Sequence, residues 1–189
     1  LLREMVFGLD AGFSEEALVQ RLNADLANDL GNLFSRTLAM TAKYCSGSVP
    51  SPSDIEEVDR RLRDTALETV KRVDAAMAEI AFHRSLDAIW ELVGMTNKYI
   101  DETSPWSLAK RPGAEDRLAS VIYHVLESLR FIAVLLHPYI PSAAEHMREA
   151  LGIKEPIGPG SLAALSQWGG TIPGTALTSI PPLFPRIEA

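Results

Sequence analysis

The sequence is poor in several features that would define a function directly. It has a single cysteine, Cys45, so it can form neither an internal disulfide nor a zinc site made of cysteines. No apolar run reaches the roughly 18 to 20 residues that a membrane span needs. No internal repeat and no glycine-rich loop suited to phosphate binding is visible. The sparse cysteine is typical of a reducing cytosol, and we expect a cytoplasmic protein with no membrane partner.

An excess of positive charge is also missing. The 189 residues carry 18 Lys and Arg against 25 Asp and Glu, a formal net charge of −7. A protein that binds nucleic acid through phosphates alone needs a clustered positive field. Any nucleic-acid binding must therefore rest on a few local contacts. Hydrophobic residues make up 47% of the chain, enough for one globular domain with an appendage. The start at Leu1 has neither Met nor a signal peptide, so we expect a fragment of a longer chain.

Apolar periodicity and end signals predict a helical protein. Ser14 is a good N-cap, with Phe13 placed to pack on Leu18, and Ser53 with Glu56 has the spacing of a capping box. The expected helices span 14–44, 53–80, 82–103, 114–136 and 141–151. Beyond Gly152 the chain is rich in Gly and Pro, which predicts an extended tail, docked or loosely ordered.

Three polar residues recur every fourth position of the first predicted helix. At 100° per residue Asn28, Asn32 and Arg36 sweep an arc of about 80° beside the leucine stripe, so their side chains should emerge in a row. Amides and a guanidinium can bond to the edges of unpaired RNA bases. Spacing alone favours a structural alternative, in which the two Asn bond to a neighbouring helix and Arg36 pairs with an acid.

Trp106 follows Ser104 and Pro105 in a short polar segment, in a loop or at a helix edge. An exposed indole there could stack on a nucleobase, and the alternative is an indole that covers the end of the bundle. No catalytic centre or metal site is visible. The histidines lack suitably spaced carboxylates, Cys45 lacks a nearby histidine, and the charged stretch 56–64 indicates a solvated surface.

Four segments resemble the anticodon-binding helical domain of methionyl-tRNA synthetases. They are LVQRLNADLANDLGNLFSR (18–36), NKYIDETSPW (97–106), LHPYIP (136–141) and PLFPRIE (182–188). The first alone would also fit related class I synthetases, whereas the tryptophan segment and the Phe-Pro-Arg-Ile ending favour the methionine enzymes. Their order and spacing agree over nearly the whole chain.

The resemblance implies an all-α, antiparallel bundle of about five helices, of the class Ia anticodon-binding type, with an extended Gly/Pro-rich C-terminal tail. Such a bundle would read the CAU anticodon of methionine tRNA. Trp106 would stack on an anticodon base, Asn32 and Arg36 would bond to base edges or backbone, and Asn28 would support them. Pro105 and Asp101 would shape the turn.

The resemblance also implies a larger enzyme. The parent polypeptide would join methionine to its tRNA with ATP and Mg²⁺, on a catalytic fold whose His-Ile-Gly-His and Lys-Met-Ser-Lys-Ser motifs are absent from this sequence. This part would then bind RNA without catalysing and without a cofactor of its own. Residues 1–12 would end the connection to the catalytic domain, 13–152 form the bundle, and 153–189 form a tail that docks back.

Two other function classes compete with anticodon recognition. A helical protein-interaction module could use Trp106 as a hot spot, because Trp and Arg dominate many protein interfaces. Such a module predicts no dependence on RNA sequence and little on salt. A self-contained enzyme would need a catalytic pair, which the sequence does not show.

Overall fold

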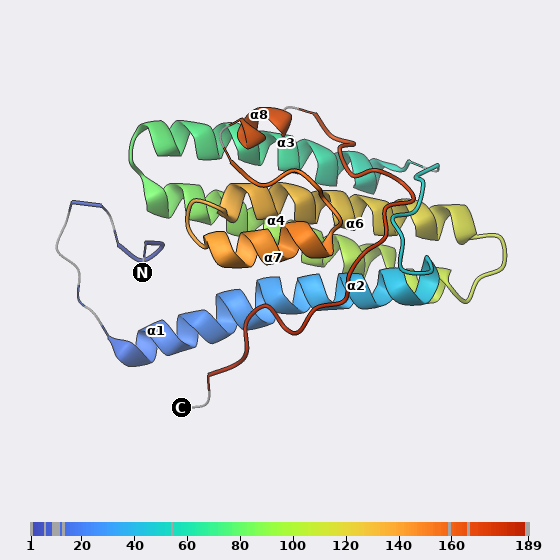
Figure 1. Ribbon diagram of the computed structural model, residues 1–189, viewed down its shortest axis with the longest axis horizontal. Coiled ribbons are helices and arrows are strands. Elements are labelled where there is room, and N and C mark those ends of the chain that lie inside the picture. The colour runs from blue at the N-terminus through green and yellow to red at the C-terminus, as the bar shows by residue number, and fades with distance from the viewer. Residues whose placement is uncertain are drawn as a thin grey trace.

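The computed structural model describes residues 2–5, 7–8, 12, 14–53, 55–158, 160–165 and 167–187, and their regular structure is helical (Figure 1). The elements in chain order are α1 (Glu15–Arg21), the π-helical segment η1 (Leu22–Gly31), α2 (Asn32–Tyr44), α3 (Glu57–Ala78), α4 (Phe82–Thr103), α5 (Pro105–Leu108), α6 (Glu115–Leu136), α7 (Pro141–Ala150) and α8 (Ser161–Ala164). The all-α class is confirmed, and α4, α6 and α7 match three predicted helices closely. The one-turn helices α5 and α8 were not predicted.

The first predicted helix is helical throughout but is not one α-helix. Ser14 caps it as expected, since its Oγ accepts a hydrogen bond from the Ala17 amide (3.3 Å). The predicted packing of Phe13 on Leu18 lies outside the described residues. The middle of the helix, η1, is π-helical over ten residues. π-Helices are rare overall but frequent at functional sites, so η1 indicates a functional surface on this part of the bundle.

The predicted start of the second helix was wrong. The capping box is formed by Glu56 and Asp59, not by Ser53 and Glu56, and the Glu56 amide donates to the Asp59 carboxylate at 2.7 Å. The Ser53 amide instead donates to Ser120 Oγ on α6 (2.9 Å). Asp59 is completely buried, so the prediction that the charged stretch 56–64 is a solvated surface is wrong for this residue.

Helix α6 is the centre of the bundle. It packs against α3, α4 and α7, and Leu126, Leu129, Phe131 and Ile132 on it are fully buried. Among the described helices it alone has the length and composition of a membrane span, but 89% of that stretch is buried inside the bundle. Burial on nearly all sides explains why its sequence is almost continuously apolar.

A buried carboxylate on α6 holds the segment that follows α8. The Glu127 carboxylate accepts from the amides of Gly169 (2.7 Å), Gly170 (3.0 Å) and Thr171 (2.9 Å), and from the Thr171 hydroxyl. Arg130 pairs with it at 2.5 Å. Burial alone would raise the pKa of Glu127, but these hydrogen bonds and the Arg130 charge outweigh it and lower that pKa below its usual range.

From there the chain returns to the first helix. It is bonded to the 47–49 loop through Val49 and Thr175 (2.9 Å) and crosses α2, after which it lies along η1 (Figure 1). Near its end, Asn23 on η1 bonds to both backbone groups of Ile187, at 3.0 Å each. The Gly- and Pro-rich residues thus form an extended strap across the helices.

Candidate nucleic-acid interface

A sharp turn between α4 and α5 presents Trp106. Ser104 ends α4 in the left-handed region (φ 44°, ψ 63°), a conformation uncommon for residues other than glycine. The right-handed region is disfavoured before a proline, and the Ser104 hydroxyl donates back to the Asp101 carbonyl (2.9 Å). Pro105 is buried at the first turn of α5, whereas Trp106 is 43% exposed. The expected position at a helix edge is therefore refined: the indole stands on a one-turn helix.

Arg36 joins α2 to α4. Its Nη2 donates to Asn97 Oδ1 (2.8 Å), and its Nη1 lies 3.6 Å from Asp101 Oδ1. The structural alternative for Arg36, pairing with an acid, is therefore what the structure shows. The Arg36 side chain keeps 28% exposure, so it still faces solvent at the surface where α2 meets α4. Asn97 was missed as a member of this cluster, although it lies in the segment whose resemblance was noted.

Asn28 and Asn32 lie elsewhere on the same face. Both are exposed, and neither side chain has a hydrogen-bond partner among the described residues. They line a groove of about 640 Å³ between the first helix and the C-terminal tail. The other lining residues are Ala27, Gly31, Ser35, Pro182, Phe184, Pro185 and Arg186. The alternative that these amides bond to a neighbouring helix has no support in the described residues.

The π-helical segment changes how the three residues are related. Asn28 belongs to η1, whereas Asn32 and Arg36 belong to α2, so the arc worked out for a uniform α-helix does not apply to Asn28. The structure pairs Arg36 with Asp101 near the Ser104 turn and places the two amides beside the tail. The predicted row is therefore two neighbouring clusters that meet at Asn32 and Arg36, one helical turn apart.

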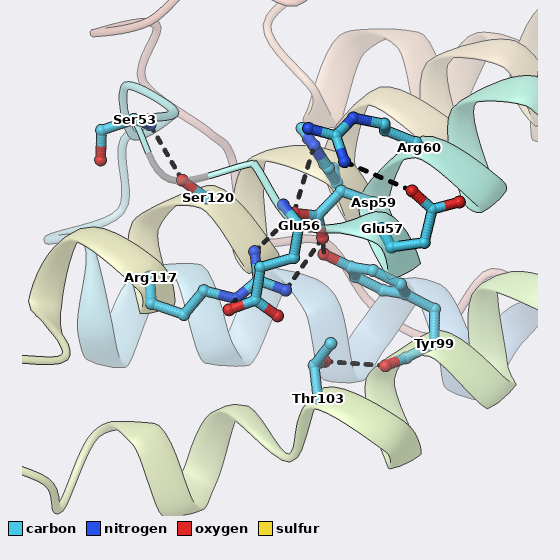
Figure 2. A network of polar contacts seen from close by, with 10 residues as sticks. Ser53, Glu56, Glu57, Asp59, Arg60, Tyr99, Thr103, Arg117 and Ser120 are labelled. Atoms are coloured by element: carbon cyan, nitrogen blue, oxygen red, sulfur yellow. Dashed lines mark hydrogen bonds and ion pairs between the residues drawn. The ribbon is translucent and has the colours of Figure 1, made fainter.

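A buried polar cluster ties the last turn of α4 to α3 and α6 (Figure 2). Asp59 on α3 accepts from the Tyr99 hydroxyl on α4 (2.5 Å) and from Arg117 on α6 (2.5 and 3.0 Å). The Tyr99 carbonyl in turn accepts from Thr103, the last residue of α4 (2.7 Å). The cluster thus joins α3, α4 and α6 close to the C-terminal end of α4.

The titration of this cluster follows from its partners. Burial alone would raise the pKa of Asp59, but hydrogen bonds from Arg117 and Tyr99 outweigh burial and lower that pKa below its usual range. Burial and the neighbouring Asp59 raise the pKa of Tyr99. The pair Asp59 and Arg117 is therefore charged at neutral pH, while Tyr99 is a neutral donor. In the part of the chain that the structure describes, no group of three or more His, Cys, Asp or Glu side chains is placed to hold a metal ion.

Comparison with known proteins agrees with this architecture. A family model described as the anticodon-binding domain of methionyl tRNA ligase matches residues 49–189. The methionine–tRNA ligase of Bacillus subtilis is 46% identical over 195 residues, covering 100% of this chain and 28% of that protein. The methionine–tRNA ligase of Caldanaerobacter subterraneus is 45% identical over 188 residues, covering 100% of this chain and 29% of that protein.

Solved structures show the same likeness. The free form of Mycobacterium tuberculosis methionyl-tRNA synthetase superposes with a TM-score of 0.90 at 38% identity, over 100% of this chain and 38% of that chain. The complex of the same synthetase with methionyl-adenylate superposes with a TM-score of 0.89 at 38% identity, over 98% of this chain and 36% of that chain.

The fold and site define an all-helical bundle with an exposed indole, free amides and a partly exposed arginine on its surface. The chain belongs to the family of methionyl-tRNA ligase anticodon-binding domains. It spans less than a third of the length of the curated relatives named above. The family match does not favour the protein-interaction alternative.

Proposed function

We propose that this chain recognises the CAU anticodon loop of methionine tRNA. The observation that carries the proposal is the Trp106 indole, 43% exposed on α5 and held there by the buried Pro105 and the Ser104 turn. An aromatic face offered by a rigid backbone suits stacking on an unpaired base. With a net charge of −7, specificity rather than general phosphate attraction must supply the binding.

The other predicted residues have compatible roles. Asn32 and Arg36 would bond to base edges or backbone, with Asn28 beside them, and the bonds of Arg36 to Asn97 and Asp101 hold its guanidinium in place before RNA arrives. A side chain already ordered loses less conformational entropy on binding. Asp101 shapes the turn through its carbonyl, which accepts from Ser104.

The whole polypeptide is proposed to be a cytoplasmic methionine–tRNA ligase. The relatives carry that name, and one solved relative holds methionyl-adenylate, an activated methionine of the kind formed from ATP. The use of ATP and Mg²⁺ would lie with a catalytic domain of the same polypeptide outside this chain. The described residues would contribute the tRNA contacts alone.

A binding experiment tests the anticodon proposal. A CAU stem-loop and one with a changed anticodon are titrated, at fixed moderate salt, against the wild-type chain and the variant Trp106→Ala. Loss of one stacked base costs about 1–3 kcal/mol, so we expect Kd for the CAU stem-loop to rise about 5- to 150-fold.

Two further variants serve as controls. Trp106→Phe keeps an aromatic face and should retain part of the affinity, whereas Ile172→Ala removes another exposed apolar side chain, 71% exposed, and should change nothing. Equal binding of both stem-loops by the wild-type chain would contradict the proposal. An affinity for a protein partner that depends on Trp106 but not on RNA would support the interaction module instead.

A further inference from the structure

The rings of His124 and Trp168 meet where the strap lies on α6. Trp168 follows α8, from which the strap runs across the bundle (Figure 1). The centres of the two rings are 5.8 Å apart and their planes stand at 85° to each other. The Trp168 ring also lies 5.4 Å from the ring of Phe131 on α6. The strap thus covers a histidine of the central helix with an aromatic ring.

The imidazole of His124 is buried and has no hydrogen-bond partner among the described residues. The residue is 4% exposed, and its Nδ1 is buried without a partner there. Its Nε2 lies 4.0 Å from Asp59 Oδ2, too far for a hydrogen bond. With one proton on Nε2, which faces Asp59, a second proton on Nδ1 would be a buried donor without an acceptor, which costs free energy. The covered site therefore favours the neutral imidazole.

The charged groups around His124 come from α3 and α6. Burial of the imidazole lowers its pKa below the usual range and is the largest influence. The carboxylates of Asp59 and Glu127 oppose this shift, but they do not outweigh it. The guanidinium groups of Arg63 and Arg117 add to it. Exposure of the imidazole to water would therefore raise its pKa toward the ordinary value.

Residues 168–171, the latch, are held on α6 by groups that do not titrate near neutral pH. Three latch amides donate to the Glu127 carboxylate, and the Tyr123 hydroxyl donates to the Thr171 carbonyl (3.1 Å). Hydrogen bonds and the Arg130 charge outweigh burial and lower the pKa of Glu127. Burial raises the pKa of Tyr123. Acidification from about pH 7.5 to about 5.5 therefore changes the charge of the imidazole but not that of these anchors.

We propose that His124 makes the latch sensitive to pH: the neutral imidazole keeps the latch packed on α6, and protonation of the imidazole favours its release. Release lets water reach the ring, and water solvates the charged form. Acid then shifts the population toward the open latch, because the open form accepts the proton more readily. RNA takes no part in this change, so it does not depend on the proposed anticodon function.

NMR titration and hydrogen exchange of the RNA-free chain test the proposal. The His124 imidazole is titrated, and protection of the 169–171 amides, corrected for intrinsic exchange rates, is compared at pH 7.5 and 5.5. The variant His124→Phe keeps a ring and removes no side-chain hydrogen bond among the described residues. The variant Trp168→Ala keeps the imidazole but removes its cover. His146→Gln, which changes an exposed histidine of α7, is the matched control.

In the wild-type chain we expect the His124 imidazole to titrate below the usual value of about 6.5. Each pH unit below that value favours protonation of the open latch about tenfold, so protection at 169–171 should fall about five- to tenfold between the two pH values. The fall should be below about twofold in His124→Phe, and His146→Gln should match the wild type. In Trp168→Ala the imidazole should titrate near 6.5, and protection should be low at both pH values.

Four results would overturn the proposal. An imidazole that titrates above about 6.5 would mean that Asp59 or the Trp168 ring stabilises the charged form, so that acid closes the latch. An equal fall of protection in the wild type and in His124→Phe would assign the pH dependence to another group. Protection at 169–171 as strong as at the buried α6 residues Leu126 and Leu129 would mean that the latch opens only when the bundle unfolds. If His124→Phe does not fold, Trp168→Ala decides, because an unchanged His124 pKa in that variant would show that the strap does not cover the imidazole.

Discussion

Replacement of Asp59 by Asn should destabilise the bundle strongly although the two side chains have nearly the same shape. Asp59 is fully buried, and it accepts two hydrogen bonds from Arg117, whose side chain is 11% exposed. The change removes the negative charge and leaves a guanidinium buried beside a neutral amide. Breaking a buried pair in this way costs about 3–5 kcal/mol.

The structure places the expected loss at the lower end of that range. Arg117 Nε also lies 3.2 Å from Glu56 Oε1. In Asp59→Asn, Glu56 would therefore still balance part of the Arg117 charge, although water screens this ion pair because the Glu56 side chain is 61% exposed. We therefore expect a loss of about 3 kcal/mol in the free energy of unfolding. For a chain of this length that corresponds to a fall of about 6–12 °C in Tm.

Urea unfolding followed by circular dichroism at neutral pH measures the effect. Asp64→Asn is the matched control, because Asp64 lies on the same helix with its side chain 64% exposed and pairs only with its neighbour Arg63 among the described residues. It should change the unfolding free energy by less than about 0.5 kcal/mol. A loss below about 1 kcal/mol for Asp59→Asn would refute the reasoning from the buried charge.

The same variant predicts a pH dependence with a defined sign. The pKa of Asp59 is lowered in the folded protein, so its stabilising contribution is complete above the unfolded value of about 3.9 and is lost as pH falls through the lower folded value. The stability gap between wild type and Asp59→Asn should narrow as pH falls below about 4. A gap that does not narrow below about pH 4 would contradict this assignment.

Two further predictions concern other charged anchors. Glu127→Gln leaves Arg130 without its buried carboxylate partner, so we expect the free energy of unfolding in urea to fall by about 3 kcal/mol. Hydrogen exchange at the amides of Gly169 to Thr171 should become faster. Unchanged exchange at these amides would contradict the role of Glu127 as the tail anchor. Arg3→Ala removes the ion pair with Asp25 (2.6 Å) and the guanidinium 5.2 Å from the Trp90 ring centre, and should cost about 1–2 kcal/mol with altered tryptophan fluorescence. Wild-type fluorescence and stability in Arg3→Ala would show that this contact does not hold the N-terminal segment.

Much of the helical architecture could be predicted because its signals are local. The α4 helix ends at Thr103 because the right-handed region is disfavoured for Ser104, the residue before Pro105. The α7 helix begins at Pro141, whose fixed φ suits a first helical turn. The almost continuous apolar run of α6 indicates its central position. In contrast, η1 has the same apolar spacing as an ordinary α-helix, so π-helical hydrogen bonding left no recognisable pattern. It coincides with contacts from Arg3 and Phe184, which are remote in sequence.

The site could be predicted only in part for a similar reason. Trp106 and its proline gave a local signal, and the resemblance supplied the proposed roles of Asn32 and Arg36, which remain predictions. The charged stretch 56–64 indicated a solvated surface, which is wrong for Asp59. Only the packing of α3 against α4 and α6 shows that Asp59 faces inward to Tyr99 and Arg117. The groove at Asn28 was beyond sequence reasoning, since its second wall comes from the other end of the chain.

The hydrogen bonds between Asn23 and Ile187 have a consequence for synthesis on the ribosome. The two residues are 164 positions apart, so at about 5–20 residues per second η1 emerges roughly 8 to 33 s before the segment that covers it. During that interval the helices between them can pack, but the face of η1 on which Phe184 will lie stays open to water and to other nascent chains. The last described residues therefore set the time at which this surface becomes protected.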